Sequence, residues 1–274
     1  MHERIAITAS DGVKLAGDCL GDGPPLYAIH GGPATDRRAF GQYLEPIASY
    51  RQLLLLDQRG CGDSDDASPD RYTLARLAED IEDARVHLRQ DKVEILGHSF
   101  GCSVAVSYAL RYPHSVRTLI LVDGAIRGWR GIVAAPGAWW LWAKTVWIGL
   151  RNEADSTEFH LAHEVANADK RQEVRELLAS PRRYDPARVQ RLSMAAARPA
   201  DLRPLISAGV PVLGIYGKQD KRFVGEAGYL RSVGASVVLI DGAGHFPFVE
   251  QHQAFHQTVR EFLETRSVGH KRIA

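Results

Sequence analysis

The stretch Val93-Glu94-Ile95-Leu96-Gly97-His98-Ser99-Phe100-Gly101-Cys102 decides how this chain folds. Its apolar first half predicts a short buried strand, and the residues after it predict a helix that runs to Tyr112. The pattern Gly97-x-Ser99-x-Gly101 is typical of a sharp strand-to-helix turn that exposes a serine hydroxyl at its tip. Glycine suits both flanking positions because strand and helix pass close together there. The alternative is an ordinary turn in which Ser99 only caps the helix.

Strand and helix patterns alternate along most of the chain around this turn. Two short strands, 5–8 and 13–19, flank turn residues and are expected to form a hairpin. Continuous apolar runs then predict strands at 26–29, 53–56, 116–122, 210–216 and 237–240, and an amphipathic pattern predicts a helix over 73–89. Apolar strands that alternate with helices are typical of a mostly parallel sheet with helices on both faces.

One segment interrupts this alternation. From residue 127 to residue 198 the sequence shows only helical patterns, and the strand and helix patterns resume after it. We therefore expect an α/β core made of residues 1–126 and 199–274, with an all-helical lid, residues 127–198, inserted after the sixth strand.

Composition and charge disfavour several classes of function. The formal net charge is +1, and no part of the chain concentrates Lys and Arg over several helical turns, so we expect no nucleic-acid partner. Cys19, Cys61 and Cys102 are odd in number and widely spaced, which disfavours a disulfide framework. No spacing of Cys and His is typical of a metal site, so no metal is expected. No apolar signal segment precedes the first strand, which favours a cytoplasmic location.

Residues 131–150 are almost entirely apolar and have about the length of a membrane span. Pro136-Gly137 interrupt them, and they lie between two segments of the α/β pattern, so we favour a buried lid helix and expect no membrane span.

All five tryptophans lie in the same part of the chain. In a helix that begins at Gly137, Trp139 and Trp142 lie on one face, with Trp140 and Trp147 beside it. Because almost the whole circumference of this helix is apolar, the body of the domain covers only one side. Two interpretations remain open for the other side, namely a substrate pocket over Ser99 lined by these tryptophans, or a homodimer interface.

Three chemically complementary residues each follow a predicted buried strand, namely Ser99, Asp220 and His245. The carboxyl ends of parallel strands meet at one edge of a sheet, so these side chains are expected to lie close together. Serine does not ionise at neutral pH and needs a base, and His245 in that role needs an acceptor on its other ring nitrogen. Asp220 is the favoured acceptor, and Asp123, which ends the preceding strand, is the alternative.

Five motifs together resemble the α/β-hydrolase superfamily, over roughly residues 1–125 and 200–265. They are His30-Gly31-Gly32-Pro33, Asp57-Gln58-Arg59-Gly60-x-Gly62-x-Ser64, the turn at Ser99, Gly217-x-x-Asp220 and Gly242-x-Gly244-His245. The first two motifs are most similar to the prolyl iminopeptidase branch. The resemblance implies Ser99 as nucleophile, Asp220 as acid and His245 as base, with no cofactor. It also implies that the backbone N–H groups of Phe100 and Gly32 (or Gly31) stabilise an oxyanion.

Two details differ from the usual iminopeptidase pattern, which has H-G-G-P-G and G-G-S-W-G where this chain has Ala34 and His98-Ser99-Phe100. Gly-His-Ser-x-Gly is common among esterases, lactonases and carbon–carbon bond hydrolases of the superfamily. The first hypothesis is therefore a serine hydrolase that cleaves a small, largely apolar ester, lactone or amide through an acyl-enzyme. A prolyl iminopeptidase-type aminopeptidase is the second, and a ligand-binding or non-hydrolytic (lyase or cyclase) protein on the same fold is the third.

Overall fold

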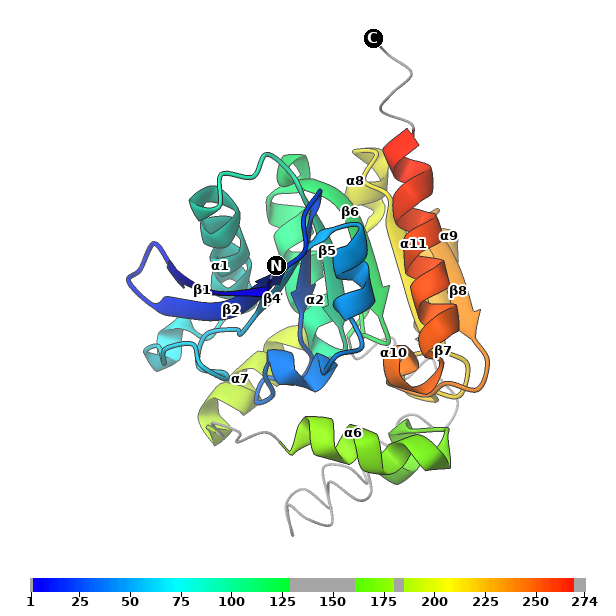
Figure 1. Ribbon diagram of the computed structural model, residues 1–274. Helices are drawn as coiled ribbons and strands as arrows, with labels where there is room; N and C mark the ends of the chain where they lie inside the picture. The colour runs from blue at the N-terminus through cyan, green and yellow to red at the C-terminus, as the bar shows by residue number, and fades with distance from the viewer. Residues whose placement is uncertain (1, 129–160, 180–184, 269–274) are drawn as a thin grey trace.

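The computed structural model describes residues 2–128, 161–179 and 185–268, and these form an eight-stranded sheet with helices on both faces (Figure 1). The strands are β1 (His2–Thr8), β2 (Lys14–Leu20), β3 (Pro25–Ile29), β4 (Gln52–Leu56), β5 (Val93–His98), β6 (Val116–Val122), β7 (Val212–Gly217) and β8 (Ser236–Ile240). Their order across the sheet is β1-β2-β4-β3-β5-β6-β7-β8. Only the pairs β1–β2 and β2–β4 are antiparallel, so the predicted mostly parallel sheet is confirmed.

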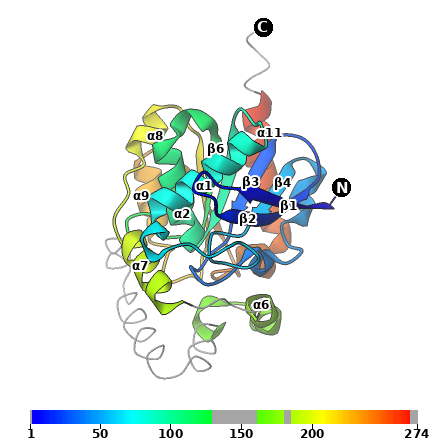
Figure 2. The ribbon, with the colours of Figure 1, turned by 90° about the vertical axis from the view of Figure 1, so that its left-hand side faces the viewer.

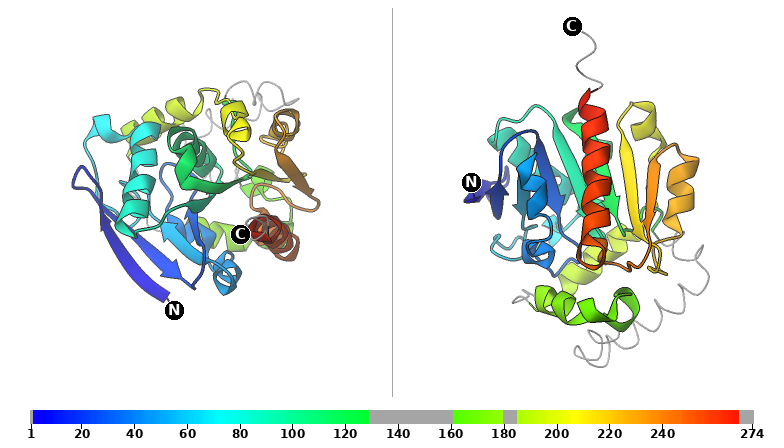
Figure 3. Two further views of the ribbon diagram at one scale, coloured as in Figure 1. Left: turned by 90° about the horizontal axis from the view of Figure 1, so that it is seen from above. Right: turned by 45° about the vertical axis from the view of Figure 1, so that its right-hand side comes forward.

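Helices cover both faces of this twisted sheet (Figure 3). One face carries α1 (Leu74–His87), α2 (Phe100–Arg111), α8 (Arg203–Ser207) and α9 (Glu226–Ser232), and the other carries α11 (His252–Val268) with the 3₁₀ helices η1 (Arg37–Phe40) and η2 (Glu45–Ser49). Side chains of a central strand alternate between the two cores: Tyr27 belongs to the α1–α2 core, and its neighbours Leu26 and Ala28 belong to the α11 core. The short helices η3 (Pro69–Arg71), η4 (Pro113–Ser115) and α10 (Pro247–Glu250) lie in connections.

The loop after β4 is held in place by a buried ion network. Arg59 has no exposed surface, and its guanidinium donates to Asp80 at 2.7 Å and to Asp11 at 2.9 Å. These bonds join the loop to the β1–β2 turn and to α1. Removal of Asp80 or Asp11 would leave the buried charge of Arg59 uncompensated and would destabilise the fold. We therefore assign this loop a structural role.

The described helices of the insertion lie at one end of the sheet, with α6 on the side of α10 and α7 on the side of α1 and α2 (Figures 1 and 2). They are η5 (Ala168–Lys170), α6 (Arg171–Leu178) and α7 (Pro186–Ala196). Asp185 starts α7 as its N-cap by accepting from the N–H of Ala187 at 2.9 Å. Arg188 in α7 donates to the carbonyl of Pro33, so the insertion contacts the loop after β3.

The segment with the four candidate pocket tryptophans, Trp139, Trp140, Trp142 and Trp147, lies outside the described residues, as does the whole of 131–150. Within the described ranges, no helix is both long enough and apolar enough to cross a membrane.

Candidate active site

The turn between β5 and α2 holds Ser99 in a strained backbone conformation, with φ 53° and ψ −120°. The flanking glycines are required by close packing. A Cβ on Gly97 would lie 2.6 Å from the carbonyl oxygen of Gly101, and a Cβ on Gly101 would collide with the carbonyl of Ile29. The strand, the turn and the helix therefore meet as the Gly97-x-Ser99-x-Gly101 pattern predicts.

Ser99, His245 and Asp220 form a chain of two hydrogen bonds. The ring nitrogen Nε2 of His245 lies 2.9 Å from Oγ of Ser99, and Nδ1 lies 2.7 Å from Oδ2 of Asp220. Because a carboxylate only accepts, Nδ1 carries the proton, and Nε2 accepts from the serine hydroxyl. The structure thus brings together three side chains that follow β5, β7 and β8.

The carboxyl of Asp123, which follows β6, lies close to Asp220 and His245 but forms no hydrogen bond with Ser99, His245 or Asp220. It accepts from the backbone N–H of Gly217, at 2.9 Å to Oδ1 and 3.2 Å to Oδ2. Burial, reinforced by the nearby charge of Asp220, raises the pKa of Asp123 well above its ordinary value. Burial also opposes ionisation of Asp220, but the charge and hydrogen bond of His245 outweigh it and lower the pKa of that carboxyl.

The residues predicted to supply oxyanion donors, Phe100 and Gly32 (or Gly31), lie beside Ser99. Phe100 is the first residue of α2, and the Ser99 side chain does not cap the helix, so the Phe100 N–H has no partner within the helix. Gly31 and Gly32 line the same cavity as Ser99. A Cβ on Gly31 would lie 2.9 Å from Cβ of Ser99, so the loop after β3 lies directly against the serine.

A cavity of about 240 Å³ lies at Ser99. Its described lining is Gly31, Gly32, Thr35, Ala39, His98, Ser99, Glu164, Leu178, Arg222, His245 and Phe246. Burial, helped by the charge of His245, lowers the pKa of His98 to about 3. His98 is therefore neutral, and its Nε2 lies 2.9 Å from the carbonyl oxygen of His245, to which it donates.

Glu250 in α10 joins the insertion to the loop that carries His245. Its Oε1 accepts from the N–H groups of Gly244 and Phe246 at 2.9 and 3.2 Å. Its Oε2 accepts from those of Ala166 and Asn167 at 2.7 and 3.0 Å.

The N–H of His245 itself donates to the carbonyl of Glu164 at 2.6 Å, so this loop is fixed from both sides. Sequence reasoning missed Glu250. Its position five residues after His245 is the one sequence feature that could have pointed to it.

Asp123, Asp220 and His245 also form the one group of three potential metal ligands in the described part of the chain, with ligand atoms within 4.8 Å. However, Nδ1 of His245 is bonded to Asp220, and both oxygens of Asp123 accept from Gly217. A metal ion would have to break these bonds, so we interpret the group as a hydrogen-bond network.

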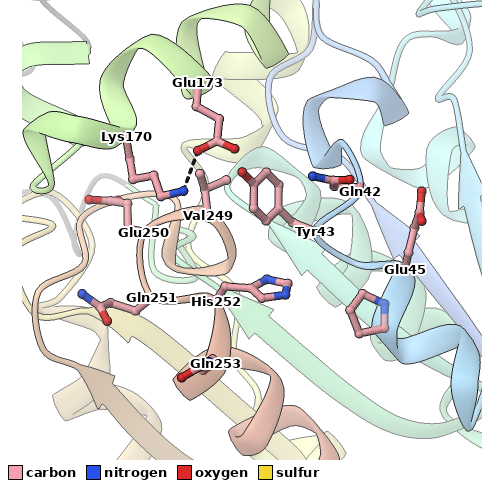
Figure 4. A pocket seen from close by; sticks show the side chains of 11 residues that line it. Gln42, Tyr43, Glu45, Lys170, Glu173, Val249, Glu250, Gln251, His252 and Gln253 are labelled. Atoms are coloured by element: carbon pink, nitrogen blue, oxygen red, sulfur yellow. Dashed lines mark hydrogen bonds and ion pairs between the residues drawn. The ribbon is translucent and has the colours of Figure 1, made fainter.

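A larger hollow of about 880 Å³ lies elsewhere on the molecule (Figure 4). On one side it is bounded by η5 and α6, and on the others by η2 and by the junction of α10 and α11. Lys170 and Glu173 form a 2.7 Å ion pair at its edge, the Lys170 ammonium lies 6.0 Å from the centre of the Tyr43 ring, and His252 lies beside Tyr43. None of the three hydrogen-bonded side chains lines it, so the smaller cavity at Ser99 is the candidate active site.

The strand order and the Ser99–His245–Asp220 arrangement are those of an α/β hydrolase. A family model described as the alpha/beta hydrolase fold matches residues 24–251, which include all three side chains. The chain therefore belongs to the α/β hydrolase family.

Proline iminopeptidases are among the curated proteins that this chain resembles in sequence. The proline iminopeptidase of Lactobacillus delbrueckii subsp. bulgaricus is 37% identical over 114 residues, which cover 39% of this chain and 38% of that protein. The chain thus matches well under half the length of the curated relatives. The resemblance to proline iminopeptidases predicted from the motifs is confirmed.

Two solved structures are similar over nearly the whole chain. A thermophilic esterase from Thermogutta terrifontis has a TM-score of 0.74 and 23% identity, covering 96% of this chain and 99% of that one. The proline iminopeptidase-related protein from Thermus thermophilus has a TM-score of 0.76 and 20% identity, covering 96% of this chain and 98% of that one. At these identities the likeness shows the fold.

Proposed function

We propose that this protein is a cofactor-independent serine hydrolase in which Ser99 is the nucleophile, His245 the base and Asp220 the acid. The observation that carries this proposal is the pair of hydrogen bonds, 2.9 Å and 2.7 Å, that runs from Ser99 through His245 to Asp220. Membership of a hydrolase family and similarity to esterases and peptidases support it.

The chemistry follows from the positions of the protons. Ser99 Oγ attacks the substrate carbonyl carbon as its proton passes to Nε2 of His245, and Asp220 stabilises the imidazolium that forms. The N–H groups of Phe100 and Gly32 (or Gly31) donate to the oxyanion of the tetrahedral intermediate. His245 then protonates the departing alcohol or amine, which leaves an acyl group on Ser99. Water, deprotonated by His245, attacks this acyl-enzyme and releases the acid and the free serine.

For the substrate we propose a small ester, lactone or amide. The cavity of about 240 Å³ supports this size. We further propose that residues 127–198 act as the lid of a core formed by 1–126 and 199–274, because Glu164 and Leu178 of the insertion line the same cavity as Ser99. For Trp139, Trp140, Trp142 and Trp147 we propose a role either in the substrate pocket or in an interface between two copies of the chain.

Aminopeptidase activity of the iminopeptidase type is the second candidate, and the curated relatives favour it. The two functions separate on a substrate panel of p-nitrophenyl butyrate, a small lactone and proline p-nitroanilide. We expect turnover of the ester and the lactone, and the aminopeptidase proposal predicts preferential release from the proline substrate. No turnover of any of them would favour the ligand-binding alternative.

Ser99→Ala tests the mechanism. It should lower kcat by roughly 10⁶ while the folded state is retained, since the nucleophile itself is removed. Circular dichroism checks folding, and ester hydrolysis checks activity. Turnover retained in the alanine variant would contradict the mechanism.

A further inference from the structure

The candidate active-site cavity contains one guanidinium and one carboxylate, and they are paired with each other. Nη1 of Arg222, in the loop after β7, lies 2.6 Å from Oε1 of Glu164 in the insertion. Among the described residues that line this cavity, no other Lys, Arg, Asp or Glu is present. Within the described lining, this pair therefore sets the charge that a substrate meets beside Ser99.

Arg222 lacks acceptors for the rest of its guanidinium. Within the described part of the chain, its Nε and Nη2 have no hydrogen-bond partner, and they have almost no surface open to water. Oδ1 of Asp220 lies 3.9 Å from Nε, which is beyond hydrogen-bond distance. The guanidinium lies over the ring of Phe223 at 4.9 Å, which offers no conventional acceptor. Charged donors left in this state are destabilising, and a ligand that supplies acceptors removes that cost.

The two unpartnered nitrogens are adjacent on the planar guanidinium. Their N–H bonds run parallel along one edge, in the spacing that matches the two oxygens of a carboxylate. The side chain lines the cavity and is about a fifth exposed, whereas the two unpartnered nitrogens are themselves buried. A carboxylate in the cavity would reach that edge after a rotation about the terminal torsions of the side chain. We propose that Arg222 binds a carboxylate of the substrate, so that the enzyme acts on esters or lactones that carry a free carboxylate near the bond cleaved. This inference rests on the hydrolase function proposed above and names its substrate class.

The same pair bears on the aminopeptidase alternative. A carboxylate that recognises a substrate ammonium group has to be available to it, and Glu164 is already bonded to Arg222. An anionic substrate, in contrast, meets two N–H donors that have no acceptor. The described lining of the cavity is therefore better suited to a carboxylate than to an amine.

Matched substrate pairs test this proposal. One pair is the p-nitrophenyl monoester of adipic acid and p-nitrophenyl hexanoate, which differ by a carboxylate on the acyl side. The other pair is 4-acetoxybenzoate and its methyl ester, which differ on the leaving-group side. In at least one pair we expect the anionic substrate to have a kcat/KM about tenfold or more above that of its neutral partner, mainly through KM.

The ratio of anionic to neutral kcat/KM should fall by about tenfold or more in Arg222→Met, because the fork of donors is lost. Glu164→Gln should raise the ratio, because it removes the carboxylate that competes for the guanidinium. Lys221→Met is the matched control, since it removes the same charge from the exposed neighbouring residue and should leave both the ratio and the basal activity unchanged. An identical ratio in the wild type and in Arg222→Met would overturn the proposal.

Calorimetric titration of Ser99→Ala with the adipate monoester measures binding without turnover. The carboxylate site predicts that the adipate monoester binds more tightly than the hexanoate ester, and that this difference is lost in Ser99→Ala/Arg222→Met. If this binding result were obtained but the wild type hydrolysed no ester, only the proposed hydrolysis would be wrong. Turnover of neutral esters with equal binding of both ligands would overturn the carboxylate site alone.

Discussion

Two aspartates at the ends of neighbouring strands have opposite electrostatic behaviour. Asp123 follows β6 and Asp220 follows β7, and both are almost completely buried, with 0% and 1% of their surface exposed. The pKa of Asp123 is raised by burial and by the charge of Asp220. The pKa of Asp220 is lowered because the charge and hydrogen bond of His245 outweigh burial. Burial is thus common to both, and the hydrogen-bond partner decides which carboxyl ionises.

This difference predicts unequal effects on activity. Asp220→Asn keeps the shape of the side chain but presents an amide to His245 and disfavours the required tautomer, so kcat should fall by up to about 10⁴. Asp123→Asn keeps an acceptor for the Gly217 N–H and should change kcat by less than about tenfold. Steady-state hydrolysis of an activated ester measures both, and the reverse ranking would assign the acid role to Asp123.

A third buried carboxylate sharpens the comparison, because Glu250 bonds only to backbone N–H groups in the described structure. Glu250→Gln places an amide donor against two of these N–H groups and should loosen the His245 loop. A loss of up to about 10² in kcat is expected, with KM less affected, since small misplacement of a reacting group is costly.

Glu261→Gln, an exposed carboxylate on α11, is the matched control and should behave as the wild type. A purely structural role for Glu250 would lower the melting temperature and leave the kcat of the folded enzyme unchanged.

The smallest expected effect is on stability as a function of pH. Asp123 has a raised pKa, so its contribution is present below its unfolded pKa, about 4, and is lost as the pH rises through its folded pKa. Asp123→Asn should therefore gain stability relative to the wild type as the pH rises above about 4.

Asp220 has a lowered pKa, so its contribution is present above its unfolded pKa and is lost as the pH falls through its folded pKa. Asp220→Asn should therefore lose stability relative to the wild type as the pH rises toward about 4, and the difference should stay constant above that pH. Urea unfolding at about pH 2.5, 4, 5.5 and 7 checks both signs, and parallel profiles for the two variants would contradict the assigned charge states.

The motifs predicted the parts of this molecule that depend on local pattern. The bounds of β6, residues 116–122, match the apolar run residue for residue, and the three strand ends place Ser99, Asp220 and His245 together. These succeed because a buried strand needs a continuous apolar run, and because parallel strands share one carboxyl edge.

The contacts that complete the site could not be predicted in this way. Glu250 bonds residues about 84 positions away, and Arg222 pairs with Glu164 across the insertion. No local sequence pattern predicts either contact, because both depend on how the insertion packs against the core. The apolar pattern around Trp139 and Trp142 likewise indicates burial without indicating what covers them.

The central claim, that Ser99 is the nucleophile, is tested most directly by mass spectrometry after reaction with a fluorophosphonate. The account predicts a single adduct, on the peptide that contains Ser99, absent in Ser99→Ala, formed more slowly in Asp220→Asn and at a near wild-type rate in Asp123→Asn. An adduct on another residue, or one that persists in Ser99→Ala, would contradict it.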